Sequence, residues 1–328
     1  MTLNPRAAWF ASWIALTALT GCESALTGNE GNFQFSYEAD DRVNDFNKPL
    51  AVGASLDLEV RDVGARQPVT LSAADFAEAG VLEVSTFADQ NITITGVGEG
   101  TALLEVEGTT ANGQTLTDSV NLQSRIPEVL ELRHTCSDGA EAAYLTNARA
   151  YVPFELEMSN GQPVIGYGYY PLDDVTGVTV NRSDSNQTHI ALDAGGTSAT
   201  VTLSSTIDDT TLDVVLVSEA EIDGITEPIA WVIEDIDVGD TNPFYVLPTA
   251  MGRTICQANV TKTVVSSTPE ICTIRERDPV PGSGDGTFEF GWFDVTGVAA
   301  GTCEYVVTYP GGDGGAGVSA TFTFPIEP

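Results

Sequence analysis

Side chains suited to acid–base or nucleophilic chemistry are unevenly represented in this chain. Its 328 residues include 47 Asp and Glu but only two His, at positions 134 and 189. Catalysis by a Ser-His or Cys-His pair needs an imidazole, and no G-x-S-x-G nucleophile motif is present. His134 lies close to a cysteine, and His189 lies in an alternating apolar segment, where we expect a strand residue on the surface. The sequence therefore predicts a protein that is not an enzyme.

The carboxylates suit a different chemistry, the binding of calcium. Ca²⁺ takes about six to eight oxygen ligands, often from loops between β domains. Two acidic clusters flank a predicted domain boundary near Gly224, although neither matches an EF-hand or cadherin-type loop. Solvated carboxylates along strand edges are the competing interpretation, and the sequence leaves both open. The candidate ligands are Glu219, Glu221, Asp223, Glu234, Asp235, Asp237 and Asp240.

A third candidate is an aromatic segment in which Tyr167, Tyr169 and Tyr170 alternate with or adjoin glycines. Exposed aromatic rings stack on sugars or anchor protein contacts, so a glycan or a surface protein is one partner for these side chains. The alternative is a bulged strand with Tyr167 and Tyr169 on one face and Tyr170 on the other. A zinc site is disfavoured because no C-x-x-C pair occurs.

The balance of charge excludes one class of partner. Thirteen Lys and Arg against 47 Asp and Glu give a net charge of −34. A nucleic-acid binder needs a basic surface that displaces counterions from phosphates, so we expect no nucleic acid among the partners. Hydrophobic residues make up 42% of the chain, enough for about two or three domains with their own cores. The acids therefore belong to folded surfaces.

Residues 1–21 have the outline of an export signal. Arg6 is the one charged residue, and an apolar run from Ala7 to Thr20 follows it. As a helix this run is about 21 Å long, shorter than the roughly 30 Å of a bilayer core. It ends in Leu19-Thr20-Gly21-Cys22, which resembles the lipobox of bacterial lipoproteins.

That resemblance implies that the thiol of Cys22 accepts a diacylglycerol and that Cys22 becomes the mature N-terminus. An ordinary secretory signal with a chance cysteine is the alternative. By resemblance to lipoprotein sorting in double-membrane bacteria, Glu23 indicates the outer membrane, with either face open. Anionic lipid repels so acidic a chain, so the lipid must hold it. We expect residues 22–32 to form a flexible polar tether.

From residue 33 onward the pattern predicts antiparallel sheets. Apolar and polar residues alternate in short runs, as in Leu56 to Val60 and Ile92 to Thr95, with Gly, Asn or Asp between runs. One short helix is expected at Ser72–Ala79, where Ser72 can cap the start and Gly80 can end it.

One segment recurs three times and sets the predicted domains. It reads ITITGVGEGTALLEV at 92–106, HIALDAGGTSATVTL at 189–203 and FDVTGVAAGTCEYVV at 293–307. Its glycines Gly100, Gly196 and Gly301 are separated by about the length of one β-sandwich, and we expect them to supply a positive φ. The first and third copies resemble the closing motif of bacterial Ig-like domains of the Big family, and the second copy is a weaker match.

The Big-family resemblance implies three tandem Ig-like β-sandwiches, at 33–125, 126–223 and 224–328. It also implies surface adhesion, carbohydrate contact or a spacer role. The predicted fold class is thus all-β, with tandem sandwiches after a cleaved lipoprotein signal peptide. We expect a lipid-anchored, non-enzymatic binding, adhesion or spacer module of the cell envelope. A periplasm-facing structural or assembly subunit of an envelope complex is the alternative.

Four cysteines remain once Cys22 carries lipid, and four cysteines allow three pairings in an oxidising compartment. The resemblance implies that Cys272 and Cys303 bridge two strands of the third domain, as in a cysteine-bearing variant of the same motif. Elimination then pairs Cys136 with Cys256, which would join the second domain to the third.

Overall fold

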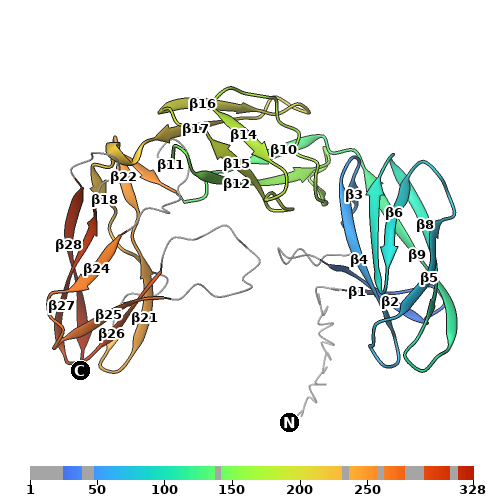
Figure 1. The fold of residues 1–328 in the computed structure, drawn as a ribbon, viewed down its shortest axis with the longest axis horizontal. Helices are drawn as coiled ribbons and strands as arrows, with labels where there is room; N and C mark the ends of the chain where they lie inside the picture. The colour runs from blue at the N-terminus through green and yellow to red at the C-terminus, as the bar shows by residue number, and fades with distance from the viewer. Residues whose placement is uncertain are drawn as a thin grey trace, which may run out of the picture.

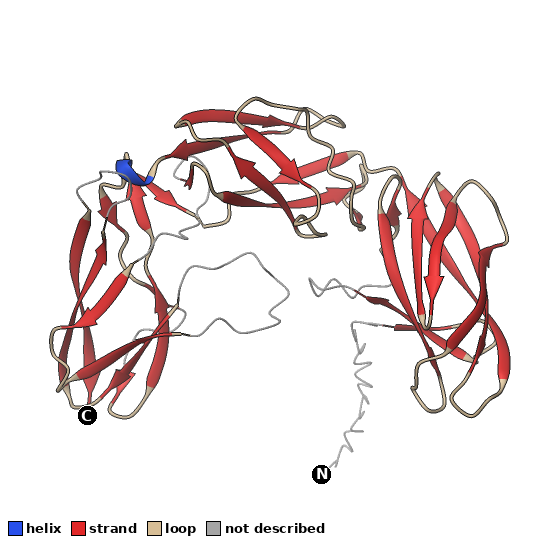
Figure 2. Ribbon diagram, viewed as in Figure 1, coloured by secondary structure: helices blue, strands red, loops and turns tan. Residues whose placement is uncertain are grey.

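The computed structural model describes residues 25–38, 48–136, 142–230, 236–256, 262–277, 292–310 and 317–328. Nearly all of its elements are strands, apart from one 3-10 turn, η1 (Glu219–Glu221). The predicted all-β class with tandem β-sandwiches is confirmed, and the three sandwiches follow one another along an arch (Figures 1 and 2). None of the helical structure in these ranges has the length and apolar character needed to cross a membrane.

Domain 1 packs two sheets against each other. Alternate side chains such as Phe33, Leu56 and Leu104 are fully buried between them. One sheet has the order β1 (Ala25–Thr27), β2 (Phe33–Glu38), β4 (Ser55–Asp62), β7 (Asn91–Gly96), β6 (Leu82–Ala88), and the other β3 (Leu50–Ala51), β9 (Thr115–Arg125), β8 (Gly100–Thr109), β5 (Thr70–Phe76).

Domain 2 shares its second sheet with residues beyond the predicted boundary at 224. The first sheet has the order β10 (Val129–Leu132), β12 (Arg149–Glu157), β15 (His189–Ala194), β14 (Val178–Asn181), with β13 (Pro163–Val164) paired to β12. The second runs β16 (Ala199–Ser204), β17 (Thr211–Val217), β11 (Ala142–Leu145), β23 (Arg253–Ile255), β22 (Pro248–Ala250), β18 (Gly224–Ile225). The chain therefore returns to domain 2 after residue 224, and a single cut there does not separate the domains.

Domain 3 repeats the plan of domain 1. One sheet has the order β19 (Ile229–Ala230), β21 (Thr241–Tyr245), β26 (Phe293–Gly297), β25 (Cys272–Glu276). The other runs β20 (Ile236–Asp237), β28 (Val318–Glu327), β27 (Gly301–Tyr309), β24 (Thr263–Ser266). An aromatic core built around Phe244, Tyr305 and Phe324 fills the space between them, with ring centroids 4.9–5.4 Å apart.

Each copy of the recurring segment crosses from one sheet of its sandwich to the other. It comprises β7 and β8 in domain 1, β15 and β16 in domain 2, and β26 and β27 in domain 3. Gly100 and Gly301 have φ of 153° and 151°, whereas Gly196 is not among the glycines with positive φ. The expected backbone is therefore present in the two copies that resemble the Big-family motif.

The glycine that ends the first strand of this motif is required by a close backbone approach. A Cβ at Gly96 would lie 2.6 Å from the carbonyl oxygen of Ala51. We expect Gly96→Ala to destabilise domain 1 by about 2–4 kcal/mol, because a backbone atom cannot move aside as a side chain can. Urea unfolding measures this. Gly64→Ala is the control, since only the Asp62 carboxylate lies near the added Cβ, at 3.2 Å. An equal loss of unfolding free energy in both variants would contradict the prediction.

Two local predictions are wrong. The expected helix at Ser72–Ala79 is largely strand β5, in which Leu71, Ala74 and Phe76 are buried against β8. The capping signal of Ser72 is overridden by this sheet pairing, and Ser72 instead lies at a β-bulge. The expected tether 22–32 contains strand β1, which pairs with β2.

The turn between β1 and β2 is held by the buried carboxylate of Asp118. It accepts hydrogen bonds from the backbone N–H groups of Glu30, Asn32 and Phe33 at 2.9, 2.7 and 2.7 Å. Burial by itself raises the pKa of Asp118, but hydrogen bonds with Glu30 and with backbone N–H groups outweigh it and place the pKa below its usual value. A Cβ at Gly28 would lie 2.2 Å from this carboxylate, so the turn closes directly on it.

Candidate functional site: the two domain junctions

Domains 1 and 2 are joined by backbone hydrogen bonds. The Ala51 N–H donates to the Ile165 carbonyl at 2.8 Å, and the Ile165 N–H donates to the Pro49 carbonyl at 3.0 Å. Ser55 and Tyr167 exchange a second pair, at 2.9 and 2.8 Å. A loop of domain 2 thus extends both sheets at one end of domain 1.

Glycines allow this loop to approach so closely. Gly166 has φ +133°, and a Cβ on it would lie 2.5 Å from Ala54 Cβ and 2.6 Å from a Leu50 methyl group. Gly53 has φ +90°, and its Cβ would lie 3.0 Å from the Tyr169 ring. A side chain at Gly166 would clash with domain 1, and one at Gly53 would be strained by the positive φ and tight against Tyr169.

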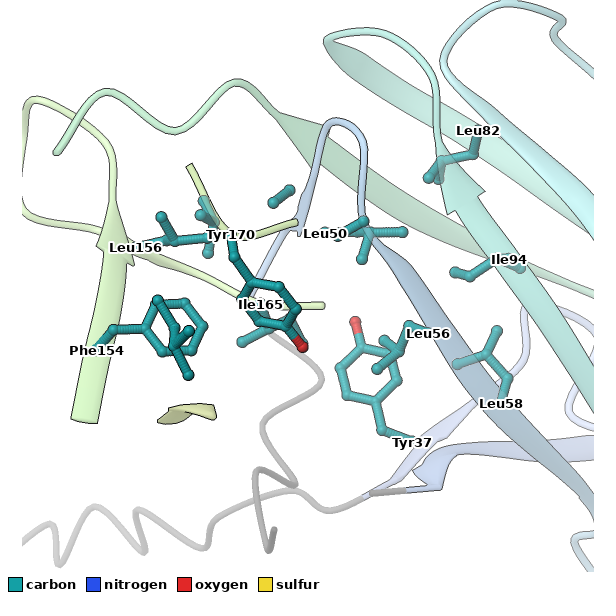
Figure 3. Close-up of a cluster of buried hydrophobic side chains, with 14 of the residues drawn as sticks. Tyr37, Leu50, Leu56, Leu58, Leu82, Ile94, Phe154, Leu156, Ile165 and Tyr170 are labelled. Atoms are coloured by element: carbon teal, nitrogen blue, oxygen red, sulfur yellow. The ribbon is translucent and has the colours of Figure 1, made fainter. Parts of the chain in front are cut away.

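The three tyrosines belong to this junction. Tyr170 is 4% exposed and packs edge-to-face on Phe154, with ring centroids 5.7 Å apart. Figure 3 shows Tyr170 and Ile165 of domain 2 facing Leu50 and Tyr37 of domain 1. Because Tyr170 is buried, its ring does not stack on an external ligand.

Tyr167 and Tyr169 are half-buried against the same hydrophobic core, which runs without a break from domain 1 into domain 2. The Arg182 guanidinium lies 5.9 Å from the Tyr170 centroid and donates to the Gly168 carbonyl at 2.6 Å. The aromatic segment therefore acts as the packing between two domains.

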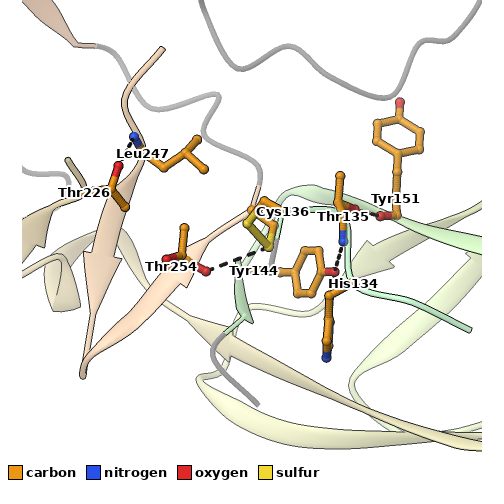
Figure 4. The surroundings of a disulfide bond; sticks show 9 residues. His134, Thr135, Cys136, Tyr144, Tyr151, Thr226, Leu247 and Thr254 are labelled. Carbon is orange, nitrogen blue, oxygen red and sulfur yellow. Dashed lines mark hydrogen bonds between the residues drawn. A yellow bond between two sulfur atoms is a disulfide. The ribbon is translucent and has the colours of Figure 1, made fainter. Parts of the chain in front are cut away.

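Domains 2 and 3 share a sheet, and a disulfide fixes the segment that returns to this sheet between strands of domain 3. A disulfide links Cys136 to Cys256, residues 120 apart in sequence with Cα atoms 5.0 Å apart (Figure 4). Next to it, β23 pairs in parallel with β11, and the Cys256 N–H donates to the Ala143 carbonyl at 2.9 Å. Buried side chains on one face of this shared sheet, such as Leu145 and Val217, belong to the hydrophobic core of domain 3.

His134 packs beside this disulfide. Its Nδ1 lies 3.2 Å from the hydroxyl of the buried Tyr144, which also accepts a 3.4 Å hydrogen bond from the Thr135 N–H (Figure 4). Burial, followed by the charge of Arg253, lowers the pKa of His134 below its ordinary value. A neutral imidazole is therefore favoured at the second junction.

His189 lies elsewhere in domain 2, and its expected surface position is wrong. It is 3% exposed and contacts the Tyr151 ring edge-to-face at 4.9 Å. Strand β15 runs between β12 and β14, and the three residues that follow His189 on it are buried on both faces. The two histidines pack on different tyrosines. His134 contacts Tyr144, and His189 contacts Tyr151.

The second predicted disulfide lies inside domain 3. Cys272 and Cys303 are both fully buried, and their Cα atoms are 5.5 Å apart. The bond links the two sheets of the sandwich through β25 and β27. Leu82 and Ala102 occupy the equivalent positions in domain 1 and are also buried.

The acidic residues that were candidate calcium ligands make separate local contacts. Glu221 accepts hydrogen bonds from Ser218, and its pKa is lowered first by its hydrogen bond with Ser198. Asp223 accepts the Met251 N–H at 2.9 Å. In the ranges that the structure describes, no group of three or more His, Cys, Asp or Glu is arranged to hold a metal ion. Glu219, Asp237 and Asp240 are exposed, and Cys22, Glu234 and Asp235 lie outside the described residues.

The segment of domain 1 that pairs with the domain 2 loop at Ile165 and Tyr167 was missed in the sequence analysis. It reads LAVGAS, residues 50–55, and recurs as IDVGDT at residues 236–241. In both copies the N–H of the glycine donates to the carbonyl of another glycine, the one that ends the first strand of the recurring motif. The distance is 2.8 Å from Gly53 to Gly96 and 2.9 Å from Gly239 to Gly297. This second repeat was a visible signal.

Comparison with known proteins gives structural likeness but no family. No family model matches the chain, and no curated protein matches it. The chain is similar to domains 4–9 of the surface-layer protein SbsC, with TM-score 0.29, 15% identity, 89% of this chain and 47% of that chain covered. It is also similar to the Escherichia coli adhesin FdeC, with TM-score 0.26 and 14% identity, covering 86% of this chain and 94% of that chain. A third similar structure is the Bacteroides ovatus protein SGBP-B, solved with a mixed-linkage heptasaccharide. Its TM-score is 0.28 and its identity 12%, with 89% of this chain and 70% of that chain covered.

Proposed function

We propose that this chain is a non-enzymatic, lipid-anchored arm of the bacterial outer membrane. Its role is to hold the domain farthest from the anchor at a fixed distance and orientation, for binding, adhesion or spacing. The observation that supports this role is that both domain junctions are locked. A chain of domains joined by free linkers would let each domain turn independently.

The two junctions are locked by different means. At the first, the hydrogen bonds of Ala51 and Ser55 run directly to domain 2, and a continuous core lies behind them. At the second, strands β18, β22 and β23 join the sheet of domain 2, and the Cys136–Cys256 bond fixes this returning segment in place. Reorienting one domain would break backbone hydrogen bonds and expose buried side chains at the same time.

Small-angle X-ray scattering of the purified chain tests this arrangement. We expect one arched conformation to account for the whole scattering curve. A curve that requires a broad ensemble of domain orientations would contradict the proposal. Gly166→Val is the matched variant, because its side chain would clash with Leu50 and Ala54 and release the first junction alone.

The anchor is tested by Cys22→Ser. We expect the wild-type chain to incorporate labelled palmitate and to fractionate with membranes, and the variant to lose both properties, because no thiol remains for the diacylglycerol. Cell fractionation and fluorography measure this. An unchanged membrane fraction in the variant would contradict lipidation at Cys22.

Protease treatment of intact cells distinguishes the two faces of the membrane. Digestion while a periplasmic marker survives would support an outward-facing binding or adhesion role. Protection until the outer membrane is permeabilised would favour the alternative, a periplasm-facing assembly subunit.

A further inference from the structure

Strand β24 forms one edge of the second sheet of domain 3 and presents an apolar side chain to solvent. Val265 at its centre is 61% exposed, the largest value among the exposed large hydrophobic residues of the described chain. The segment from Thr263 to Pro269 contains no charged residue, in a chain with 60 charges on 328 residues if histidine is excluded. An exposed, uncharged edge is a ready template for pairing with another strand.

The backbone of β24 has donors and acceptors directed at an edge that no strand of the described residues covers. The Ser267 N–H donates to the Glu304 carbonyl of β27 at 2.8 Å, and antiparallel bonding to one neighbour recurs at every second residue. Val265 therefore bonds to β27. Val264 and Ser266, on either side of it, direct their N–H and carbonyl groups away from β27.

Domain 1 protects the equivalent strand, β5. A bulge interrupts it between Leu71 and Ala73, the N–H of Leu71 is taken by the Asp89 carbonyl at 2.8 Å, and Asp75 adds a charge. Bulges and charges are the usual devices that stop edge pairing. The pairing of β24 with β27 has no register shift.

Another uncharged edge strand, β16 in domain 2, is also covered. The Asp173 N–H donates to the Ser204 carbonyl, and the Thr206 N–H donates to the Pro171 carbonyl, both at 2.9 Å. A segment of domain 2 therefore closes one end of that edge. This contrast distinguishes β24 from β5 and β16.

We propose that β24 pairs with β24 of a second copy of this chain, antiparallel about a two-fold axis at Val265. The two Val265 side chains then face each other in a non-hydrogen-bonded pair, and Val264 of each chain exchanges ladder bonds with Ser266 of the other. The sheets of two domains become one continuous sheet.

Charge opposes a second copy least at this edge. Each chain has a net charge of −34, so most pairs of faces would bring like charges together. In a two-fold pairing, the segment Thr263–Pro269 of one chain faces the same uncharged segment of the other chain. Salt should strengthen the dimer, because it screens the repulsion between the rest of the two chains.

Cysteine crosslinking tests the pairing. Val265→Cys places two thiols about 4.5–5.5 Å apart at Cβ across the axis. Thr321→Cys is the matched control, since it is exposed in the same cross-strand row but lies on β28, two strands away from β24. With a mild oxidant, in whichever cell fraction holds the protein, we expect Val265→Cys to give a disulfide-linked species of twice the chain mass and Thr321→Cys to stay monomeric.

Three crosslinking results would overturn the proposal. They are a monomeric Val265→Cys chain, equal crosslinking at Thr321, and an adduct with a different protein. Sedimentation of the purified full chain gives a second readout. Val265→Lys should weaken dimer formation at least tenfold while the melting temperature of the dilute, monomeric chain stays unchanged, and Thr321→Lys should leave the dimer intact. A wild-type chain that is monomeric at every salt concentration also contradicts the pairing. These readouts do not depend on the lipid anchor.

Discussion

Replacing both Cys136 and Cys256 by serine should lower the free energy of unfolding by about 4–5 kcal/mol. The bond closes a loop with a sequence separation of 120, and in the chain-entropy model a loop of about 100 residues contributes about 4.7 kcal/mol. The loss should appear in the segment shared by domains 2 and 3, where β23 pairs with β11. Urea unfolding with hydrogen exchange resolved by residue measures both quantities.

A matched comparison separates the junction from general disulfide loss. Serine at both Cys272 and Cys303 opens a loop with a separation of 31 that lies inside domain 3. It should destabilise domain 3, and the loss of exchange protection should be greater at β25 and β27 than at β11. If the Cys136/Cys256 variant left β11 and β23 fully protected, the disulfide would not be what holds the second junction.

Asp118→Ala should destabilise domain 1 by about 3–5 kcal/mol. The change leaves the N–H groups of Glu30, Asn32 and Phe33 without their acceptor, and each unsatisfied buried donor costs about 1–3 kcal/mol. Thermal and urea unfolding of the purified chain measure the loss. Thr117→Ala is a neighbouring control, because the Thr117 side chain is exposed and its backbone carbonyl, which accepts from Asn32, is kept.

The same carboxylate predicts a dependence on pH. Because the pKa of Asp118 is lowered in the folded protein, its contribution is complete above the unfolded value of about 3.9 and is lost as pH falls through the folded value. We therefore expect wild-type domain 1 to lose stability below about pH 4. In Asp118→Asn that part of the slope should be missing, and an identical slope would contradict the assignment.

Much of the fold is predictable because strand periodicity is a local property. Alternation at Leu56 to Val60 and the glycine of the recurring motif identify strands and their order without any knowledge of contacts. The pairing of Cys136 with Cys256 follows from arithmetic once the other cysteines have partners.

The junctions are harder because they depend on which domain faces which. The sequence around Tyr170 has the same composition whether its rings face solvent or a neighbouring domain, and burial against Phe154 is set by the domain packing. The same is true of Ser72, where pairing with β8 overrides a helix-capping signal. The role of Asp118 is equally invisible, since its partners lie more than 80 residues away in sequence.

The disulfide between domains 2 and 3 also sets how this chain responds to a pulling force. Tension applied between the N-terminal end and domain 3 passes from Cys136 through the sulfur–sulfur bond to Cys256. The intervening chain, with a separation of 120, carries no load, so the strands of domain 2 within it cannot be unravelled by stretching. At about 3.5 Å per extended residue, roughly 400 Å of chain is withheld from extension. Under tension between the two ends of the chain, the load is therefore carried by domain 1, which has no disulfide among its described residues, and by the part of domain 3 that follows Cys256.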